Sequence, residues 1–444
     1  MRLKMFGRVI LMLSIFTAVC MNSSGAVHYV SLSGTNNAPY TNWADAATNI
    51  QHAVNVAVVG DTVLVSNGTY YLTDNIAISS AITVTSVNGR EVTIVDGNNY
   101  KGKFVTNRCF YVSGSGVTLD GFTIRNGCTY YSGGGIVVYG SSSVINCRIT
   151  GNVSTGLTYG GGVSLSGSGI VMSNCEVVGN YNYAYGGAGV YMNGKGEIRN
   201  CTIASNVLRI IPGFGENHRG AGLFAAGDGS GGISVTIDCC VVYGNVITNA
   251  GGKGAVGLIQ GVLIRNSFIN NNFVDGIAGG LSLYASSGGK SMVQNCTIAS
   301  NYASSDGGGI FVQSAAGSTT IVRNVVCYYN SSAGVYSNFK ADSISYTGVY
   351  QIVNSCIAPT NAFPTSGVVG YYYSGNIESN PQFVNKDAGN FRLSQNSPCI
   401  NTGTNQDWMT NAVDLDGRTR IRYGTVDMGA YETIYEGTIY RMGF

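Results

Sequence analysis

Short runs of alternating apolar and polar residues, each followed by a turn residue, repeat down most of this chain. One seven-residue pattern occurs seven times, and the copies read NCRITGN (146–152), NCEVVGN (174–180), NCTIASN (200–206), CCVVYGN (239–245), NSFINNN (266–272), NCTIASN (295–301) and NVVCYYN (324–330). Successive copies begin 26 to 39 residues apart. A period of this size without helical spacing predicts a stacked repeat architecture.

Each repeat has a second half, in which a glycine cluster precedes alternating apolar residues. Examples are GGGIVV (133–138), GGGVSL (160–165), GAGLFA (220–225) and GGGIFVQ (307–313). Glycine turns joined to strands of a few residues, at nearly constant spacing, predict an all-β chain coiled into a parallel β-helix. Further strands are expected at 62–65, 81–86, 92–95, 109–112 and 117–124. In such a solenoid each side chain lies above its counterpart one rung away.

One segment near the N-terminus has helical rather than strand spacing. Ala47, Ile50, Ala53, Val54 and Ala57 share one face of a helix, which predicts a single amphipathic helix over residues 43–57. The end of a solenoid exposes apolar surface and open strand edges. This helix is therefore interpreted as the N-terminal cap.

Two columns of asparagine follow from the repeat. The first column is Asn146, Asn174, Asn200, Asn266, Asn295 and Asn324, and the second is Asn152, Asn180, Asn206, Asn245, Asn272, Asn301 and Asn330. Asparagine tolerates left-handed backbone, and stacked amides can bond one another. Both columns are interpreted as turn architecture rather than ligands or glycan sites.

The cysteines follow the same register. Cys147, Cys175, Cys201, Cys240 and Cys296 occupy one repeat position, and their alternation with apolar residues places them on the inward face. Stacked side chains in register point side by side rather than toward each other, which disfavours disulfides. The sequence predicts a buried stack of free thiols.

Composition and the first residues bear on compartment and partners. Charged residues make up 10% of the chain and the net charge is +2, which excludes nucleic acid as an expected partner. Lys4 and Arg8 flank an apolar stretch at 9–19, followed by Ser24-Gly25-Ala26. This pattern predicts a signal peptide, 1–26, cleaved after Ala26. The sequence contains no second apolar run of the kind that spans a membrane. A secreted or outer-surface monomer is therefore expected.

Several segments carry a family resemblance. The expected cap helix, GDTVLVSNGTY (60–70), LDGFTIRNG (119–127) and the rung motifs resemble the pectate-lyase-like right-handed parallel β-helix superfamily. The paired rung motifs also resemble repeats of polymorphic outer-membrane proteins. NPQF (380–383), FRLSQNSPCINTG (391–403), DLDGRTR (414–420) and VDMGAYE (426–432) resemble a choice-of-anchor tail. The implied division is a signal peptide at 1–26, strand and cap helix at 27–60, rungs at 61–375 and a tail at 376–444.

The superfamily's enzymes cleave acidic polysaccharides. A lyase of this kind would need carboxylates that hold Ca²⁺ and a basic residue that takes the proton, and a hydrolase would need paired acids. No column of carboxylates appears at rung spacing, and Asp96 and Asp120 each precede glycine, as turn residues do. No metal or cofactor is therefore expected, Ca²⁺ excepted if the chain is a lyase.

Two sets of residues are candidates for function. The 39-residue step between Cys201 and Cys240 contains an insertion at 207–220, whose Glu216, His218 and Arg219 could bind an acidic sugar or act in acid–base catalysis. Tyrosines precede the glycine clusters of three successive rungs, and they should form one aromatic edge able to stack on sugars: Tyr130, Tyr131, Tyr159, Tyr181, Tyr183 and Tyr185.

Three hypotheses for function follow. The sequence favours a non-enzymatic scaffold for adhesion or binding of a cell-surface glycan. A polysaccharide lyase or glycosidase centred on the 207–220 loop is the second hypothesis. A purely structural passenger is the third, because a solenoid scaffold does not fix function.

Overall fold

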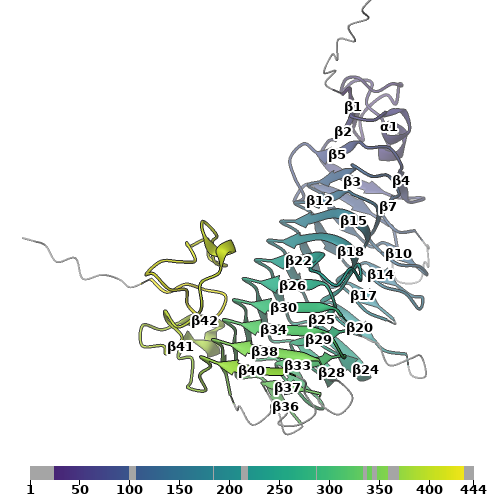
Figure 1. Cartoon of the computed structure of the whole chain (residues 1–444). Coiled ribbons are helices and arrows are strands. Elements are labelled where there is room, and N and C mark those ends of the chain that lie inside the picture. The colour runs from purple at the N-terminus through teal and green to yellow at the C-terminus, as the bar shows by residue number, and fades with distance from the viewer. Residues whose placement is uncertain are drawn as a thin grey trace, which may run out of the picture.

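The computed structural model describes residues 25–99, 107–183, 185–211, 219–286, 288–333, 338–342, 348–358 and 370–434. Short strands coil into a long stack, and a C-terminal segment folds back beside it (Figure 1). The predicted signal peptide lies almost entirely outside the described residues. No described helix has the length and apolar character that crossing a bilayer requires.

One rung shows how the coil is built. It contains β11 (Ile136–Tyr139), β12 (Ser143–Ile145), β13 (Arg148–Thr150) and β14 (Val153–Ser154). Strands β11 and β12 belong to a 21-stranded sheet, β13 to an 11-stranded sheet and β14 to an 8-stranded sheet, which we call sheets A, B and C. Successive rungs pair in parallel, as β13 does with β16 (Glu176–Val178). These pairings confirm the predicted parallel β-helix.

The remaining strands repeat this arrangement. Sheet A also contains β1 (Val27–Val30), β2 (Thr62–Val65), β4 (Ile76–Ile78), β5 (Thr83–Ser86), β7 (Phe110–Val112), β8 (Thr118–Asp120), β15 (Val163–Ser173), β18 (Val190–Arg199), β21 (Leu223–Gly227), β22 (Val235–Asp238), β25 (Val256–Ile259), β26 (Val262–Arg265), β29 (Leu281–Ala285), β30 (Lys290–Gln294), β33 (Ile310–Ser314), β34 (Thr319–Arg323), β37 (Phe339–Ala341), β38 (Val349–Val353) and β40 (Gly370–Ser374). Sheet B also contains β3 (Gly68–Tyr71), β6 (Thr93–Asp96), β9 (Thr123–Arg125), β19 (Thr202–Ala204), β23 (Val241–Tyr243), β27 (Phe268–Asn270), β31 (Thr297–Ala299), β35 (Val326–Tyr328) and β39 (Cys356–Ile357). Sheet C also contains β10 (Cys128–Thr129), β17 (Tyr181–Asn182), β20 (Val207–Arg209), β24 (Val246–Lys253), β28 (Phe273–Ile277), β32 (Tyr302–Ala303) and β36 (Ser331–Ser332).

The first asparagine column forms the corner between sheets A and B. Asn146, Asn174 and Asn200 have φ of 54°, 54° and 53°, the left-handed conformation that asparagine tolerates. The expected continuous strand at 117–124 is wrong for the same reason, because Gly121 (φ 79°) turns the chain between β8 and β9. The NCxI motif therefore spans a corner rather than lying within one strand.

The second asparagine column forms a buried ladder at the corner between sheets B and C. The Asn180 Nδ2 donates to Asn206 Oδ1 at 3.0 Å and to the Ile149 carbonyl at 2.9 Å. Asn206 repeats this pattern with Asn245 at 2.9 Å, and every member of the column is at most 5% exposed. The predicted stacking of amides is confirmed.

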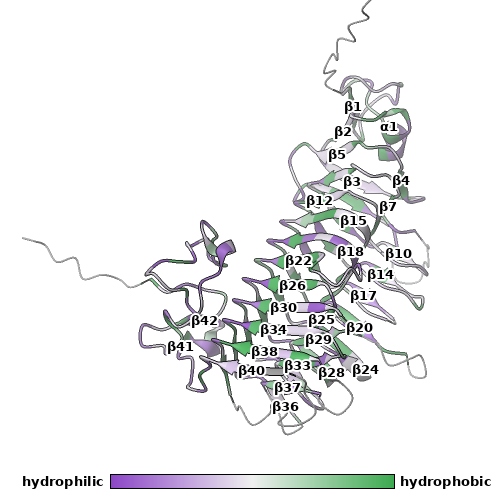
Figure 2. Cartoon of the chain, viewed as in Figure 1, coloured by the Kyte–Doolittle hydropathy of each residue, from purple (hydrophilic) through white to green (hydrophobic). Residues whose placement is uncertain are grey.

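The interior of the coil is apolar, and Figure 2 shows hydrophobic residues recurring along its strands. Cys147, Cys175, Cys201, Cys240 and Cys296 lie inside it as free thiols, at most 2% exposed. Burial raises the pKa of the Cys296 thiol to about 12. The predicted inward stack of unpaired cysteines is confirmed.

The predicted helix is shorter than expected. Helix α1 spans Ile50–Val56, and Asn49 caps it by accepting the Gln51 N–H at 2.7 Å. Residues 43–49 are not helical, because Ala47 instead exchanges backbone hydrogen bonds with the region of β1, at Tyr29 and Ser31. The helix buries Ile50, Ala53 and Val54 and contacts β1, β2 and β4.

The C-terminal segment packs on the outer face of sheet B. It contains β41 (Phe383–Asn385), η2 (Lys386–Ala388), β42 (Asn390–Leu393) and η3 (Asp407–Met409). Phe391 packs on Phe268 of β27, with ring centroids 5.1 Å apart. Within the segment, the fully buried Arg420 pairs with Glu432 at 3.3 Å and donates to the Gly429 carbonyl. The DLDGRTR and VDMGAYE motifs thus supply the polar interior of this segment.

Replacing Asn206 with alanine should lower the free energy of unfolding by about 2–5 kcal/mol, because it leaves buried partners at Asn180, Asn245 and Val177 without their hydrogen bonds. Urea unfolding followed by circular dichroism measures this change. Asn193→Ala, at an exposed position of β18, is the matched control and should change stability by less than about 0.5 kcal/mol. Equal stability of the two variants would contradict a structural ladder.

The described cysteines should resist alkylation in the folded protein at pH 8. All of them except Cys239 are buried, which keeps the reagent away, and burial raises the pKa of the partly exposed Cys239 to about 12, so its thiol stays protonated. Iodoacetamide treatment followed by intact-mass measurement should show modification of all eleven described cysteines only after unfolding in urea. Masses that reveal disulfides in the native protein would overturn the thiol stack.

Candidate functional site

Aromatic side chains gather on the outer face of sheet A, at positions fixed by strand register. Tyr111 of β7 pairs with Val137, Val137 with Ser164 and Ser164 with Tyr191 of β18. Phe224 of β21 follows Tyr191 on the next rung. The two tyrosines thus lie three rungs apart on one face, a separation of about 14 Å.

The first group, the Arg108 cluster, consists of Arg108, Tyr111, Tyr131 and Tyr139. The Arg108 guanidinium lies 5.5 Å from the Tyr111 ring centroid, and the Tyr111 and Tyr139 rings meet edge to face at 5.9 Å. Arg108 Nη2 also donates to Thr129 Oγ1 at 3.3 Å. Burial lowers the pKa of Arg108, and the phenols of the three tyrosines oppose that shift.

The charge of Arg108 has no carboxylate partner among the described residues. Its side chain is 9% exposed, and the groups that surround it are phenols and a threonine hydroxyl. A guanidinium offers five N–H donors in a planar fork, which suits a carboxylate or phosphate. The cluster therefore has the composition of an anion site with aromatic walls.

The second group, the Tyr191 cluster, consists of Tyr159, Tyr185, Tyr191 and Phe224. Tyr159 stacks on Tyr191 with ring centroids 4.4 Å apart and planes 16° apart. Tyr185 and Phe224 lie 5.4 and 5.7 Å from Tyr159. Burial raises the pKa of Tyr191 to about 12, so its hydroxyl is a donor at neutral pH. Half-buried, pre-positioned rings of this kind can stack on sugar rings.

Arg219 lies beside the Tyr191 cluster. Isolated bridges join it to Gly186 and to Lys253, and its guanidinium is 5.5 Å from the Tyr284 ring centroid. A Cβ added at Gly257 would come within 2.6 Å of the Arg219 Cβ, so this close approach requires glycine. Arg219 is 4% exposed. Its sequence companions Glu216 and His218 lie outside the described residues.

The six predicted tyrosines do not form one edge, so that expectation is wrong. Tyr159 and Tyr185 join the Tyr191 cluster, and Tyr131 joins Arg108 while contacting the exposed Tyr130 edge to face at 6.0 Å. Tyr181 lies on the outer face of sheet C, because it belongs to β17. Tyr183 follows that strand at a half-buried position.

Sequence reasoning missed several members of both clusters. Arg108 stood in a run of basic residues, and Tyr111, Tyr139, Tyr191 and Phe224 lie inside strands rather than before glycine clusters. In the sequence, these aromatic residues occupy outward-facing positions of successive strands. Placing them side by side requires the strand register between rungs, and the rungs differ in length.

The carboxylates of the N-terminal rungs are used structurally. Buried Asp96 pairs with Arg125 at 2.7 Å and accepts bonds from Asn126, and Asp120 accepts Asn146 Nδ2 at 2.8 Å. Throughout the part of the chain that the structure describes, no three His, Cys, Asp or Glu side chains are grouped as metal ligands would be.

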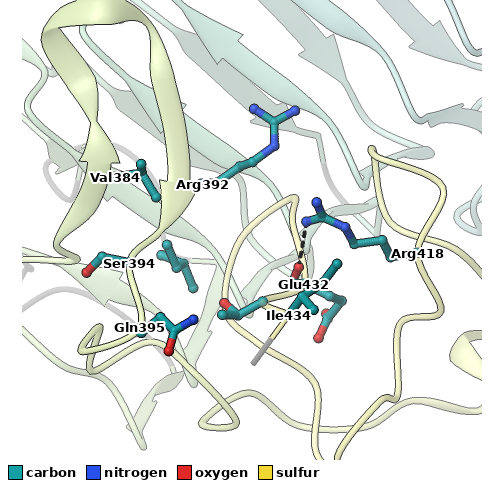
Figure 3. Close-up of a pocket in the computed structure, with 9 residues that line it drawn as sticks. Val384, Arg392, Ser394, Gln395, Arg418, Glu432 and Ile434 are labelled. Carbon is teal, nitrogen blue, oxygen red and sulfur yellow. Dashed lines mark hydrogen bonds between the residues drawn. The ribbon is translucent and has the colours of Figure 1, made fainter. Parts of the chain in front are cut away.

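A further pocket lies within the C-terminal segment (Figure 3), where Arg392 and Arg418 line it together with Glu432 and Gln395. Both arginines already pair with Asp416, and Arg418 also donates to the Glu432 carbonyl at 3.0 Å. Both cations therefore already have a carboxylate partner within the segment, unlike Arg108.

Comparison with known proteins places this geometry in a known fold. A family model described as "Right handed beta helix region" matches residues 188–388. The solved structure of pectate lyase Pel9A is similar, with 20% identity, coverage of 92% of this chain and 97% of that chain, and a TM-score of 0.56. A rhamnogalacturonan lyase structure matches with 15% identity, 82% and 92% coverage, and a TM-score of 0.42. No curated protein matches the sequence. The chain is thus a right-handed parallel β-helix with the fold of a pectate lyase.

Proposed function

We propose that this chain is an exported protein that binds an acidic polysaccharide along the outer face of sheet A. The observation that carries the proposal is Arg108, a residue 9% exposed whose guanidinium lies among tyrosines with no carboxylate partner in the described residues. A uronate carboxylate supplies the charge that this site lacks. The aromatic walls exclude water, which strengthens such a pair.

The Tyr191 cluster supports the same ligand class. Its Tyr191 and Phe224 project from sheet A, with Tyr159 and Tyr185 packed beside them, and Tyr191 lies about 14 Å from Tyr111 along the coil. Small outward side chains, including Ser164 and Ser166, separate the two clusters. A linear polymer can therefore lie across the intervening rungs, with one sugar carboxylate at Arg108 and another sugar ring against Tyr191.

Several features predicted from the sequence belong to this proposal. Export depends on cleavage after Ala26, α1 serves as the lid of the N-terminal rung, and residues 376–444 form a choice-of-anchor-type tail that holds the protein at a cell surface. Burial of Ile50, Ala53 and Val54 beside β1 and β2 supports the role of α1 as a lid.

Arg108→Gln should weaken binding to polygalacturonate by about 10- to 100-fold, since it removes a charge-assisted hydrogen bond in an aromatic site. Affinity gel electrophoresis and calorimetry with oligogalacturonates measure the loss. Arg209→Gln removes the same charge from the outer edge of sheet C and should leave binding unchanged.

Binding through Arg108 should also weaken as salt rises, because dissolved ions screen the long-range attraction between the uronate polymer and this cation. Tyr191→Ala, at the second cluster, should lower affinity without changing this salt dependence. Equal affinities for wild type, Arg108→Gln and Arg209→Gln would refute the proposed site.

A second candidate function is eliminative cleavage of the same polymer, favoured by a fold shared with a pectate lyase over nearly the whole chain. A lyase would need Ca²⁺ or another means of acidifying the proton that is removed. The absorbance of unsaturated uronate, followed during incubation with polygalacturonate with and without Ca²⁺, tests this alternative. No rise in that absorbance would exclude it. Glu216 and His218 remain the proposed catalytic side chains for that case.

A further inference from the structure

We propose a second carbohydrate site, for a neutral polysaccharide, in a groove along the corner between sheets A and B. What we call the groove is a pair of hollows on neighbouring rungs, and neither is lined by a residue of the aromatic clusters. It is bounded by the 87–91 loop at one end and by the 413–417 loop of the C-terminal segment at the other.

The first hollow has a volume of about 420 Å³ and is lined throughout by polar residues and glycine, including Asn88, Asp120, Asn146 and Asn174. The second has a volume of about 310 Å³ and is lined by Asn200 and Asp414 together with apolar Val241, Val413 and Leu415. Because the Asn174 N–H donates to the Arg199 carbonyl at 3.2 Å, the two hollows lie on neighbouring rungs. The exposed amides of three successive rungs thus form one ledge along the corner.

Nearer the C-terminal end of the coil, the tail covers this same corner, and its contacts there show what the asparagine ledge can bind. Asn324 occupies the same column, and its Oδ1 accepts the Thr404 N–H at 2.8 Å while its Nδ2 donates to the Thr404 carbonyl at 2.9 Å. The Thr404 hydroxyl donates to Asn354 Oδ1 at 2.6 Å. Asn324 therefore holds a passing chain through both its donor and its acceptor.

In the open half the corner asparagines have the same backbone, and Asn146 donates its Nδ2 to Asp120 Oδ1 at 2.8 Å, so that it offers a ligand its Oδ1. Asn146, Asn174 and Asn200 have φ within a few degrees of the 54° of Asn324, so their amides leave the corner in the same direction. All three are exposed, and the 413–417 loop of the tail lines the hollow at Asn200. Donors and acceptors repeated at about 4.8 Å suit a polymer that carries hydroxyl groups along its length.

Ion pairs fix the end of the groove at the 87–91 loop. Arg90 reaches Glu176 at 3.0 Å and donates to the Asn174 carbonyl at 3.2 Å. Arg148 joins Glu176 at 2.7 Å and Glu91 at 2.9 Å. This network holds the loop against rungs that lie far from it in sequence.

The charge of the groove distinguishes its ligand from that of sheet A. The two arginines and two glutamates of the network balance, which leaves Asp120 as the unbalanced charge in the first hollow. A net negative hollow repels uronates and favours neutral sugars. The first hollow also lacks the apolar pockets that give an extended peptide its specificity, which favours a polysaccharide over a peptide.

The test uses the double variant Asn146→Gly/Asn174→Gly, because glycine keeps the left-handed corner and removes only the amides. Galactomannan, xylan and β-1,3-glucan serve as probes in affinity gels, with calorimetry on oligosaccharides of any that bind. The full-length wild type should bind at least one of them, and the double variant should bind it about tenfold or more weakly. Asn98→Gly, the same change at a left-handed position of the opposite corner, should have no effect.

Further variants separate this site from the one on sheet A. Asp120→Asn, a milder change that preserves the corner if the double variant does not fold, should weaken binding of the neutral polysaccharide severalfold. Arg108→Gln should leave it unchanged. Failure of the wild type to bind any of the three probes, or equal binding by wild type, Asp120→Asn and the folded double variant, would overturn the proposal. So would binding that is displaced by an extended peptide but not by oligosaccharide.

Discussion

In-register parallel stacking, at about 4.8 Å per rung, is the constraint on which the rest of this molecule depends. It aligns identical backbone conformations, so a left-handed asparagine at one corner recurs at the next rung. It also aligns identical side chains, which is why amides can bond amides from Asn152 to Asn330. A single displaced rung would interrupt the hydrogen-bonded ladder and the apolar interior together.

The same constraint explains how surface chemistry arises in a chain with few charges. A residue that faces outward on one rung has neighbours above and below, whatever the distance between them in sequence. Arg90 and Glu176 meet although 86 residues separate them. The aromatic clusters of sheet A and the polar hollows at its corner are thus different columns of one stack, and they differ in charge.

The repeat allowed the sequence to predict the sheets, both asparagine columns and the buried cysteines, because these depend on period alone. The corners between the sheets were harder to predict from the sequence. Ile145 and Arg148 look like parts of one strand until the left-handed backbone of Asn146 separates them. The aromatic clusters could be predicted only in part, since Tyr159 meets Tyr191 through a glycine turn whose path the period does not specify. Packing of Phe391 on Phe268 depends on a tail that returns over distant rungs, which no repeat encodes.

The position of the C-terminal segment on sheet B has a mechanical consequence. Residues 383–432 bond to rungs near Thr297 and Asn324, so the last described residues lie on the flank of the coil rather than at its last rung. Tension applied at residue 434 would load these contacts in shear before it reached the end of the coil. The solenoid would be dragged sideways as a rigid rod, and its strands would not unzip one by one.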